Sequence, residues 1–271
     1  MADIRLENVS FSYPNGYTAV ENINLSIRQG EAVAILGQNG AGKTTTVKMM
    51  NNLTRPTKGD VYVGDKNTKK HTTAQIAKRV GYVFQNPDDQ IFHSTVYAEV
   101  EYGPKVSLRL GEEEVKARTK QALKLTGLWK QRNSNPFDLP LSIRKFVTVA
   151  AVLAMQPETI IFDEPTAGQD IHGIHLLEEI VRSLHEENKT VITITHDIEF
   201  AAENFDRIVV MAHKNILKDG SPSEIFADDA VLQEAKLKKP CAGRLAQRLG
   251  LGNHITTNRE FIEAYIAALN R

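Results

Sequence analysis

The chain has 271 residues, of which 41% are hydrophobic and 24% charged, a composition that fits one large globular domain, with or without a smaller appendage. Lys and Arg together number 33, as do Asp and Glu, so a net charge of zero gives no support for a nucleic-acid-binding protein. Cys241 is the sole cysteine, which excludes an intrachain disulfide. The sequence shows neither a secretion signal nor the roughly 18 apolar residues of a membrane helix. We therefore expect a cytosolic chain whose membrane role is at most peripheral.

The N-terminal region has the alternating pattern of antiparallel strands. Residues 3–9 and 23–27 alternate apolar and polar side chains, which predicts two half-buried strands. Residues 59–63 predict another strand. Tyr13 and Tyr17 fall in the turn between the first two strands, where their rings can be exposed. An antiparallel subdomain is expected around the motif that follows.

Residues 32–45 contain a phosphate-binding loop. An apolar run, residues 32–36, predicts a buried strand; the pattern G-x-x-x-x-G-K-T follows at 37–44, and residues 45–52 favour a helix. Glycines let successive backbone N–H groups turn inward, and the helix start adds its positive end. A glycine-rich turn that binds nothing is the alternative, and the agreement between motif and context argues against it. The predicted nucleotide-binding residues here are Gly37, Asn39, Gly40, Ala41, Gly42, Lys43, Thr44 and Thr45.

Two side chains of this loop have specific expected roles. Lys43 can bring a mobile positive charge to the β- and γ-phosphates of a nucleotide. Thr44 can supply a hydroxyl ligand for Mg²⁺. Farther along, residues 80–84 predict a strand that ends at Gln85, and ligands of open α/β sheets lie at such strand ends. The spacing alone leaves open whether Gln85 contacts a ligand or only caps a turn.

A largely helical region and a second acidic motif come next. Residues 112–126 and 141–155 predict helices within a helical stretch that covers about 88–155. Residues 159–162 then form an apolar strand that ends in Asp163 and Glu164. Such a strand is common in isolation, but downstream of a phosphate-binding loop it matches the Walker B motif. Asp163 can hold Mg²⁺ through its water shell, and Glu164 is placed to act as general base.

The last strands of the predicted sheet lead to a histidine. Residues 173–187 predict an amphipathic helix, and the strand at 190–194 leads to His196, the only one of the eight histidines at the carboxyl end of a strand. From there its side chain can donate to a γ-phosphate. Residues 208–218 predict a hairpin. The alternation of strands and helices predicts a mostly parallel sheet covered by helices.

The tail from residue 231 differs from the rest of the chain. It ends in a helix that begins at a capping box, Thr257 to Glu260, and carries Phe261, Tyr265 and Leu269 along one stripe. This stripe can contact a partner, or the helix can fold back on its own domain; the sequence leaves both open.

These motifs, in this order, resemble the ATP-binding subunits of ABC transporters over about residues 1–230. The resemblance implies an α/β fold of the P-loop NTPase class, with a mostly parallel core sheet, an antiparallel β subdomain and an α-helical subdomain at about 88–155. Residues 231–271 are then a helical C-terminal extension and a candidate dimer contact. The implied activity is ATP hydrolysis with Mg²⁺ as cofactor, coupled to transmembrane transport.

The resemblance also implies a role for each site residue. Lys43, Gln85, Glu164 and His196 are the catalytic set, and Thr44, Gln85 and Asp163 hold the metal ion. Tyr13 stands where the family stacks an aromatic ring on adenine, a contact worth about 1–3 kcal/mol, with Tyr17 as its rival. Residues 167–170 resemble the D-loop, with Gln169 in place of the usual apolar residue.

Within the family, residues 82–90 and the helical tail are most similar to the ATPases of energy-coupling-factor importers of vitamins or of cobalt and nickel ions. This narrower resemblance implies a membrane coupling protein and a substrate-binding membrane component as partners, no nucleic acid, and a place on the cytoplasmic face of the cell membrane. An ABC-class ATPase that acts on DNA or ribosomes is the alternative; it predicts coiled-coil inserts, a second cassette or a basic face, which the sequence lacks. A phosphate-loop kinase is a third possible function, but such an enzyme would lack the elements that contain Gln85 and His196.

The family's signature L-S-G-G-Q is degenerate in this chain. An ungapped alignment places it on residues 139–143, which read Leu-Pro-Leu-Ser-Ile. Pro140 has neither the hydroxyl nor the N–H that the signature serine offers to a γ-phosphate, and Leu141 and Ser142 replace glycines. A gapped alignment restores a serine but leaves Ile143 and Arg144 where two glycines belong. Because the signature completes the site of the opposite subunit in this family, we expect a heterodimer with an intact second ATPase.

Overall fold

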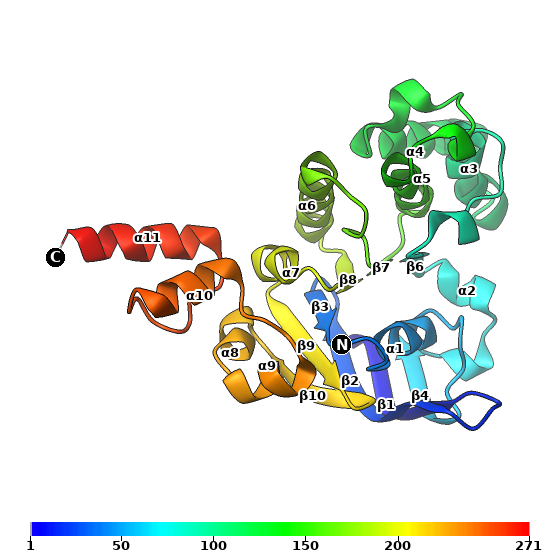
Figure 1. The fold of residues 1–271 in the computed structure, drawn as a ribbon. Helices are drawn as coiled ribbons and strands as arrows, with labels where there is room; N and C mark the ends of the chain where they lie inside the picture. Colours follow the sequence, from blue (N-terminus) through cyan, green and yellow to red (C-terminus); the bar gives the residue numbers. More distant parts are fainter. Residues whose placement is uncertain (1, 271) are drawn as a thin grey trace.

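A six-stranded sheet carries most of the predicted motifs (Figure 1). In the computed structural model, which describes residues 2–270, its strand order is β10-β9-β3-β8-β7-β6. All neighbours are parallel except the hairpin of β9 and β10, which confirms the mostly parallel sheet. The carboxyl ends of the parallel strands therefore meet at one edge. The strands are β3 (Ala32–Leu36), β6 (Val80–Val83), β7 (Thr159–Asp163), β8 (Thr190–Ile194), β9 (Arg207–Ala212) and β10 (Asn215–Gly220).

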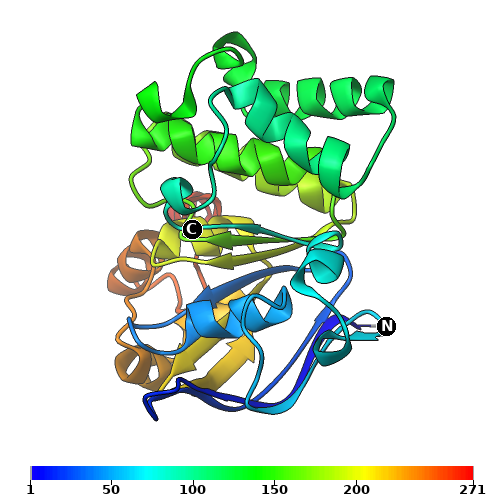
Figure 2. The same cartoon turned by 90° about the vertical axis from the view of Figure 1, so that its right-hand side faces the viewer.

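A second, antiparallel sheet has the order β2-β1-β4-β5. Its strands are β1 (Ala2–Ser12), β2 (Thr18–Arg28), β4 (Lys58–Val63) and β5 (Lys66–Asn67). Ile4 and Leu6 of β1 face inward as the alternation predicts, and so do the alternating Ile and Leu side chains of β2. Helix α1 (Lys43–Met50) lies between the two sheets (Figure 2), and its Val47, Met49 and Met50 join one apolar core with both. This packing fixes the helix that follows the phosphate-binding loop.

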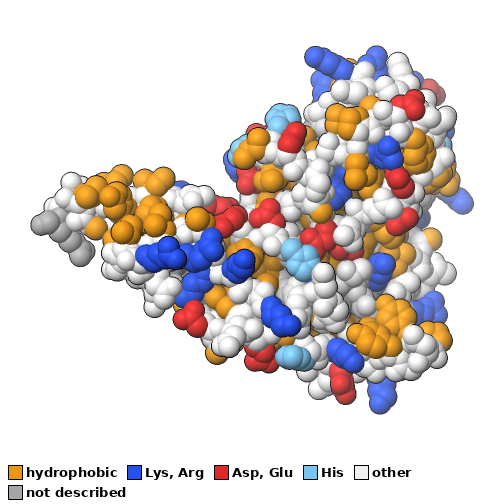
Figure 3. Space-filling view, in the orientation of Figure 1, with side chains coloured by type: hydrophobic (Ala, Val, Ile, Leu, Met, Phe, Trp, Pro, Cys, Tyr) orange, Lys and Arg blue, Asp and Glu red, His pale blue; other side chains and the backbone are white. Residues whose placement is uncertain are grey.

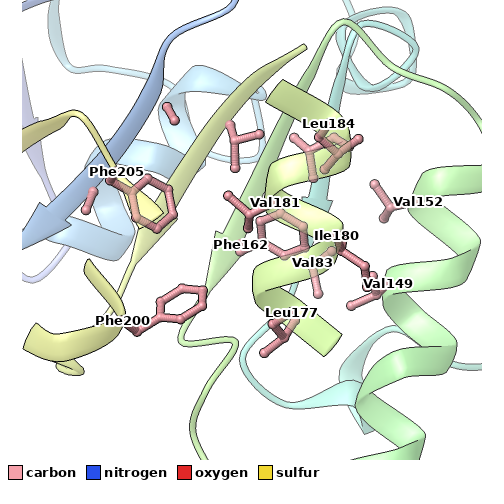
Figure 4. Packing of buried hydrophobic residues seen from close by; sticks show 14 of the residues in the cluster. Val83, Val149, Val152, Phe162, Leu177, Ile180, Val181, Leu184, Phe200 and Phe205 are labelled. Carbon is pink, nitrogen blue, oxygen red and sulfur yellow. The ribbon is translucent and has the colours of Figure 1, made fainter. Parts of the chain in front are cut away.

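Helices cover the other face of the central sheet. Phe162 of β7 is 1% exposed and packs near Val83 of β6 and Ile180 of α6 (Ile171–Glu186), as Figure 4 shows. Burying a side chain of this size contributes about 1.5–3 kcal/mol. The apolar stripe predicted for α6 is confirmed, since all four of its residues are buried: Leu177, Ile180, Val181 and Leu184.

The helical region is confirmed between β6 and β7. It contains α3 (Val96–Tyr102), α4 (Glu112–Leu125) and α5 (Leu141–Ala154), with a π-helical turn at Gly103–Ser107 and short 3-10 turns elsewhere; α2 (Thr73–Ala77) precedes β6. Helices α3, α4 and α5 form a layer above the edge of the sheet (Figure 2). Helix α5 becomes apolar along its length and joins the core beside β7 and α6.

The C-terminal helices are α7 (Ile198–Asn204), α8 (Pro222–Phe226), α9 (Asp229–Ala235), α10 (Cys241–Arg248) and α11 (Asn258–Leu269). The predicted capping box at Thr257 is confirmed, and a further capping box lies at Ser221. Helix α11 projects from the body (Figure 1) and buries none of its residues, so it does not fold back on its own domain. Apolar side chains gather along it (Figure 3). Among residues 2–270, no helix combines the length and apolarity needed to cross a membrane.

Candidate nucleotide-binding and hydrolysis site

A cavity of about 600 Å³ gathers the predicted site residues. Its lining comes from separate parts of the chain: the turn after β1, the loop after β3, and the segments after β6, β7 and β8. Gly37 and Asp163, also predicted, are not part of the lining. Ala19, Thr166 and Asp197 line the cavity without having been predicted, and so does Ala167 of the D-loop-like segment. The predicted residues in the lining are Tyr13, Asn39, Gly40, Ala41, Gly42, Lys43, Thr44, Thr45, Gln85, Glu164 and His196.

The phosphate-binding loop has a conformation that requires glycine. Gly42, the N-cap of α1, has a φ of 99°, and a Cβ there would lie 2.7 Å from the carbonyl oxygen of Ala19. Any other residue would therefore be strained and would clash with backbone. Within residues 2–270, no side chain caps α1, so the N–H groups of its first turn are available to a ligand. A helix start of this kind favours an anion such as phosphate.

Lys43 links the loop to the acidic end of the site. Its side chain is buried, and Nζ donates to the carbonyl oxygens of Gly37 at 2.7 Å and Gln38 at 3.2 Å. Nζ also lies 3.5 Å from Nε2 of His196. Burial lowers the pKa of Lys43, and the negative charges of Glu164 and Asp163 oppose that shift. The lysine charge is thus held at the cavity wall between the loop and the acidic pair.

Asp163 offers a carboxylate oxygen to a cation. Its Oδ2 accepts a hydrogen bond of 2.7 Å from the hydroxyl of Tyr82, whereas Oδ1 is buried and has no partner within residues 2–270. Burial, followed by the charge of Asp163, raises the pKa of Tyr82, so the phenol stays a donor. A buried oxygen without a partner is costly unless an ion or water satisfies it. Mg²⁺ prefers oxygen ligands, so Asp163 together with the Thr44 hydroxyl fits this ion.

Glu164 is held in an uncommon backbone conformation. Its φ is 50°, in the left-handed region that costs a non-glycine residue about 1–3 kcal/mol. Its N–H donates to Ile194, and its Oε2 accepts from the N–H of His196 at 3.2 Å. Burial raises the pKa of Glu164, while the hydrogen bond from His196 and the charge of Lys43 oppose the rise. A carboxylate with a raised pKa at the cavity wall suits a general base.

His196 stands beside this carboxylate. Its Nε2 lies 3.2 Å from Oε1 of Glu164. The side chain is 45% exposed and lines the cavity. Burial, and then the charge of Lys43, lower the pKa of His196, which favours the neutral ring. A neutral imidazole keeps one N–H that can be donated to a phosphate oxygen.

Gln85 is exposed and lines the cavity. The turn that follows is capped by Asn86, whose side chain accepts from the N–H of Asp88 at 3.3 Å. Gln90 bonds the end of β6, accepting from the N–H of Phe84 at 3.1 Å. Since these neighbours hold the turn and Gln85 lines the cavity, contact of Gln85 with a ligand stays a prediction.

Two tyrosines border the cavity at the end nearest β1 and β2. Tyr13 is 44% exposed and Tyr17 is 48% exposed. Their rings are nearly parallel, at 26°, with centroids 6.3 Å apart. The Tyr13 hydroxyl lies 3.5 Å from Oγ1 of Thr45 on the loop, whereas the Tyr17 ring has the ammonium of Lys214 4.8 Å from its centroid. Tyr13 is therefore the ring nearer to the phosphate-binding loop.

We expect Tyr13→Ala to weaken ATP binding by about 5- to 150-fold, which corresponds to the loss of about 1–3 kcal/mol of base stacking. Isothermal titration with ATP measures the change. Tyr17→Ala is the matched variant, because its ring is exposed to the same extent. A larger loss in Tyr17→Ala than in Tyr13→Ala would assign the stacking role to Tyr17.

The start of α5 lacks a donor at the position of the signature serine. Pro140 is the N-cap of this helix. Leu141, which follows, is 55% exposed. Proline offers no N–H, so the position where the family's signature presents its serine has no donor at all. The sequence expectation of a degenerate element agrees with this geometry.

The sequence reasoning did not identify Tyr82 or Lys145. Tyr82 belongs to a fully buried strand, and a buried phenol usually finds a hydrogen-bond partner, which here is Asp163 on the neighbouring strand. Lys145 is a charged residue inside the apolar part of α5, and a buried lysine needs partners. Both signals were present in the sequence, but neither names the partner.

Comparisons with known proteins agree with this site. The ABC transporter family profile matches residues 20–167, more than half of the chain. The energy-coupling factor transporter ATP-binding protein EcfA of Methanocaldococcus jannaschii is 39% identical over 254 residues, 93% of this chain and 91% of that protein. A putative ABC transporter ATP-binding protein of Methanosarcina mazei is 40% identical over 246 residues, 91% of this chain, but the chain spans only 42% of that relative's length.

A solved structure has the same fold over nearly the whole chain. It is cbiO1 from Clostridium perfringens, described as part of the ABC transporter complex cbiONQ. It is 32% identical, with a TM-score of 0.76, and the alignment covers 91% of this chain and 99% of that one. With the phosphate-binding loop, Glu164 and His196 around one cavity, these matches show that the chain belongs to the ABC transporter family, among its ATP-binding proteins.

Proposed function

We propose that this chain is the ATP-binding and ATP-hydrolysing subunit of an energy-coupling-factor importer for a vitamin or a transition-metal ion. The observation that carries the proposal is the convergence of Lys43, Glu164 and His196 on one cavity, with Asp163 directly behind it. The likeness to EcfA and cbiO1 over nine-tenths of the chain supports the importer class. The chain acts at the cytoplasmic face of the cell membrane as a peripheral subunit.

The residues have distinct roles in this proposal. The loop amides and Lys43 bind the phosphates, and Thr44, Gln85 and Asp163 hold Mg²⁺, which when bound neutralises charge that develops on the phosphates. Glu164 takes the proton of the attacking water. His196, neutral and next to Glu164, donates to the γ-phosphate.

The proposed partners follow from the degenerate signature and from the C-terminal extension. A second ATPase with an intact signature completes the site of this chain. Pro140, in turn, leaves the site of the second ATPase without its donors, so the dimer has one strong site and one weak site. Residues 1–230 form the nucleotide-binding domain, and residues 231–271 form an extension that contacts the second ATPase. A membrane coupling protein and a substrate-binding membrane component complete the importer.

Co-expression with candidate membrane components and a second ATPase tests the importer proposal. We expect the chain to be isolated with all of them in detergent, and the assembly in liposomes to couple ATP hydrolysis to substrate uptake. Lys43→Ala in this chain is the control that should leave assembly intact and reduce uptake. Isolation on DNA or ribosomes, with no membrane component bound, would favour the soluble ABC-class ATPase instead.

The surface of α11 gives a separate prediction. Ile262 and Ile266 are 55% and 52% exposed, so replacing both with Glu is expected to leave the melting temperature of the isolated chain unchanged. If both side chains are buried against the second ATPase, each contributes about 1.5–3 kcal/mol, and the double variant weakens the dimer by roughly 100-fold or more. Sedimentation of the purified dimer measures this. Leu53→Glu, at a site 42% exposed, is the control; equal weakening by it would contradict a contact through α11.

A further inference from the structure

A buried lysine joins helix α5 to the segment that carries Glu164. The side chain of Lys145 is only 4% exposed. Its Nζ donates to the carbonyl oxygen of Glu164 at 2.7 Å and to that of Ala167 at 3.0 Å. Lysine is rarely buried unless its charge is compensated, and here the charge also interacts with the carboxylates of Glu164 and Asp163. Burying the charge of Lys145 therefore costs free energy unless these contacts are kept.

A second contact joins the same two segments. The side chain of Gln169 donates to the carbonyl oxygen of Ser142, in the first turn of α5, at 3.1 Å. Residues 164–169 are thus attached to the start of α5 at both ends, at one end through Lys145 and at the other through Gln169. Gln169 is the residue that departs from the usual apolar D-loop position.

The conformation of Glu164 explains why such attachment matters. A left-handed φ of 50° at a glutamate persists only where surrounding contacts impose it. The N–H of Glu164 is fixed by Ile194 of β8, and its carbonyl oxygen by Lys145. With both peptide groups fixed, the Glu164 carboxylate is directed toward the N–H of His196, which lies 3.2 Å from Oε2.

We infer that Lys145 is a positioning residue for Glu164. The start of α5, although degenerate as a phosphate-binding signature, thereby holds residues 164–169 of its own chain in place. The inference rests on the proposed role of Glu164 as general base. It assigns α5 a function within the subunit, in addition to the weakened one across the dimer. Lys145 contacts neither nucleotide nor water in this role; it acts through the backbone of Glu164.

Lys145→Met tests the inference in the complete complex with the second ATPase. We expect kcat for ATP hydrolysis at the site built by this chain to fall by at least tenfold, while the dissociation constant for ATP changes by less than threefold. Lys145→Gln, which keeps an N–H donor, is expected to retain more of kcat than Lys145→Met does. Gln169→Leu removes the second contact and is expected to lower kcat in the same direction by a smaller factor.

Lys218→Met is the matched control. Lys218 also joins two segments, donating to the carbonyl oxygen of Glu224 at 3.2 Å and to Asp228 at 2.7 Å, but it lies outside the cavity. Its loss is expected to lower the melting temperature and leave kcat unchanged. Should Lys145→Met prove too unstable to purify, Lys145→Gln and Gln169→Leu carry the same comparison of kcat with ATP affinity.

Three outcomes separate the positioning role of Lys145 from the general-base role of Glu164. A kcat within twofold of wild type in Lys145→Met and Lys145→Gln, with Glu164→Gln inactive, overturns the positioning role and leaves the general base in place. An ATP dissociation constant that rises in proportion to the loss of kcat shows a general structural role and also overturns the inference. An active Glu164→Gln variant overturns the proposed base itself.

Discussion

Replacing Glu164 with Gln is expected to lower the rate of ATP hydrolysis by about 10²- to 10⁴-fold, the range typical of a lost general base. The substitution keeps the size of the side chain and its hydrogen bond from the N–H of His196. It removes only the carboxylate that accepts the proton of water. ATP binding is expected to stay close to that of wild type, because the phosphates are held by Lys43 and the loop after β3. Steady-state kinetics and equilibrium titration with ATP, both in the complete complex, separate the two effects.

Glu113→Gln is the control for this experiment, because Glu113 is 93% exposed on α4, outside the lining of the cavity. It should hydrolyse ATP at the wild-type rate. A Glu164→Gln variant that still turns over at a tenth of the wild-type rate or more would contradict the general-base role. A variant that fails to bind ATP would instead mean that the charge of Glu164 is needed to build the site.

Repairing the signature is expected to produce the second large effect. Changing Pro140 to Ser, Leu141 to Gly and Ser142 to Gly restores a hydroxyl, an N–H and close backbone approach at the start of α5. We expect hydrolysis by the purified chain alone to rise by on the order of 10²-fold, since one donor to a developing anion is commonly worth that factor. The carbonyl oxygen at position 142, which accepts from Gln169, is retained. The rate is measured as a function of protein concentration, because the gain depends on dimer formation.

The same three substitutions should matter much less in the complex with a second ATPase. There the partner already supplies an intact signature to Lys43, Glu164 and His196 of this chain. Leu141→Ala alone serves as the control, since it adds neither a hydroxyl nor an N–H. Vigorous, concentration-dependent hydrolysis by the unmodified chain on its own would contradict the heterodimer.

The sequence predicts the scaffold of this protein well, because its signals are local. Alternating side chains identify β1 and β2, and the spacing of Leu177, Ile180, Val181 and Leu184 identifies the buried face of α6. A capping box identifies the start of α11. Each of these signals depends on residues within one or two turns of helix, or within one strand.

The contacts that shape the site depend on register between distant segments. Tyr82 reaches Asp163 because β6 and β7 are paired neighbours, a relation that no local pattern reveals. Lys145 reaches the carbonyl oxygen of Glu164 because α5 packs beside the end of β7, and Glu164, with its positive φ, is bonded by this lysine and by β8. The site residues could be named from motifs, whereas the groups that orient them required the fold.

The strand order also constrains when this protein can become functional during its synthesis. β3, which leads into the phosphate-binding loop, pairs with β8 and β9, and about 150 residues separate the end of β3 from the start of β8. At about 5–20 residues per second, a ribosome takes about 8–30 s to make that stretch. Throughout that time the apolar strand β3 has neither β8 nor β9 beside it. The nascent chain is therefore prone to aggregate and is a substrate for chaperones. ATP, as a ligand that stabilises the folded state, can contribute only after β8 and β9 have left the ribosome.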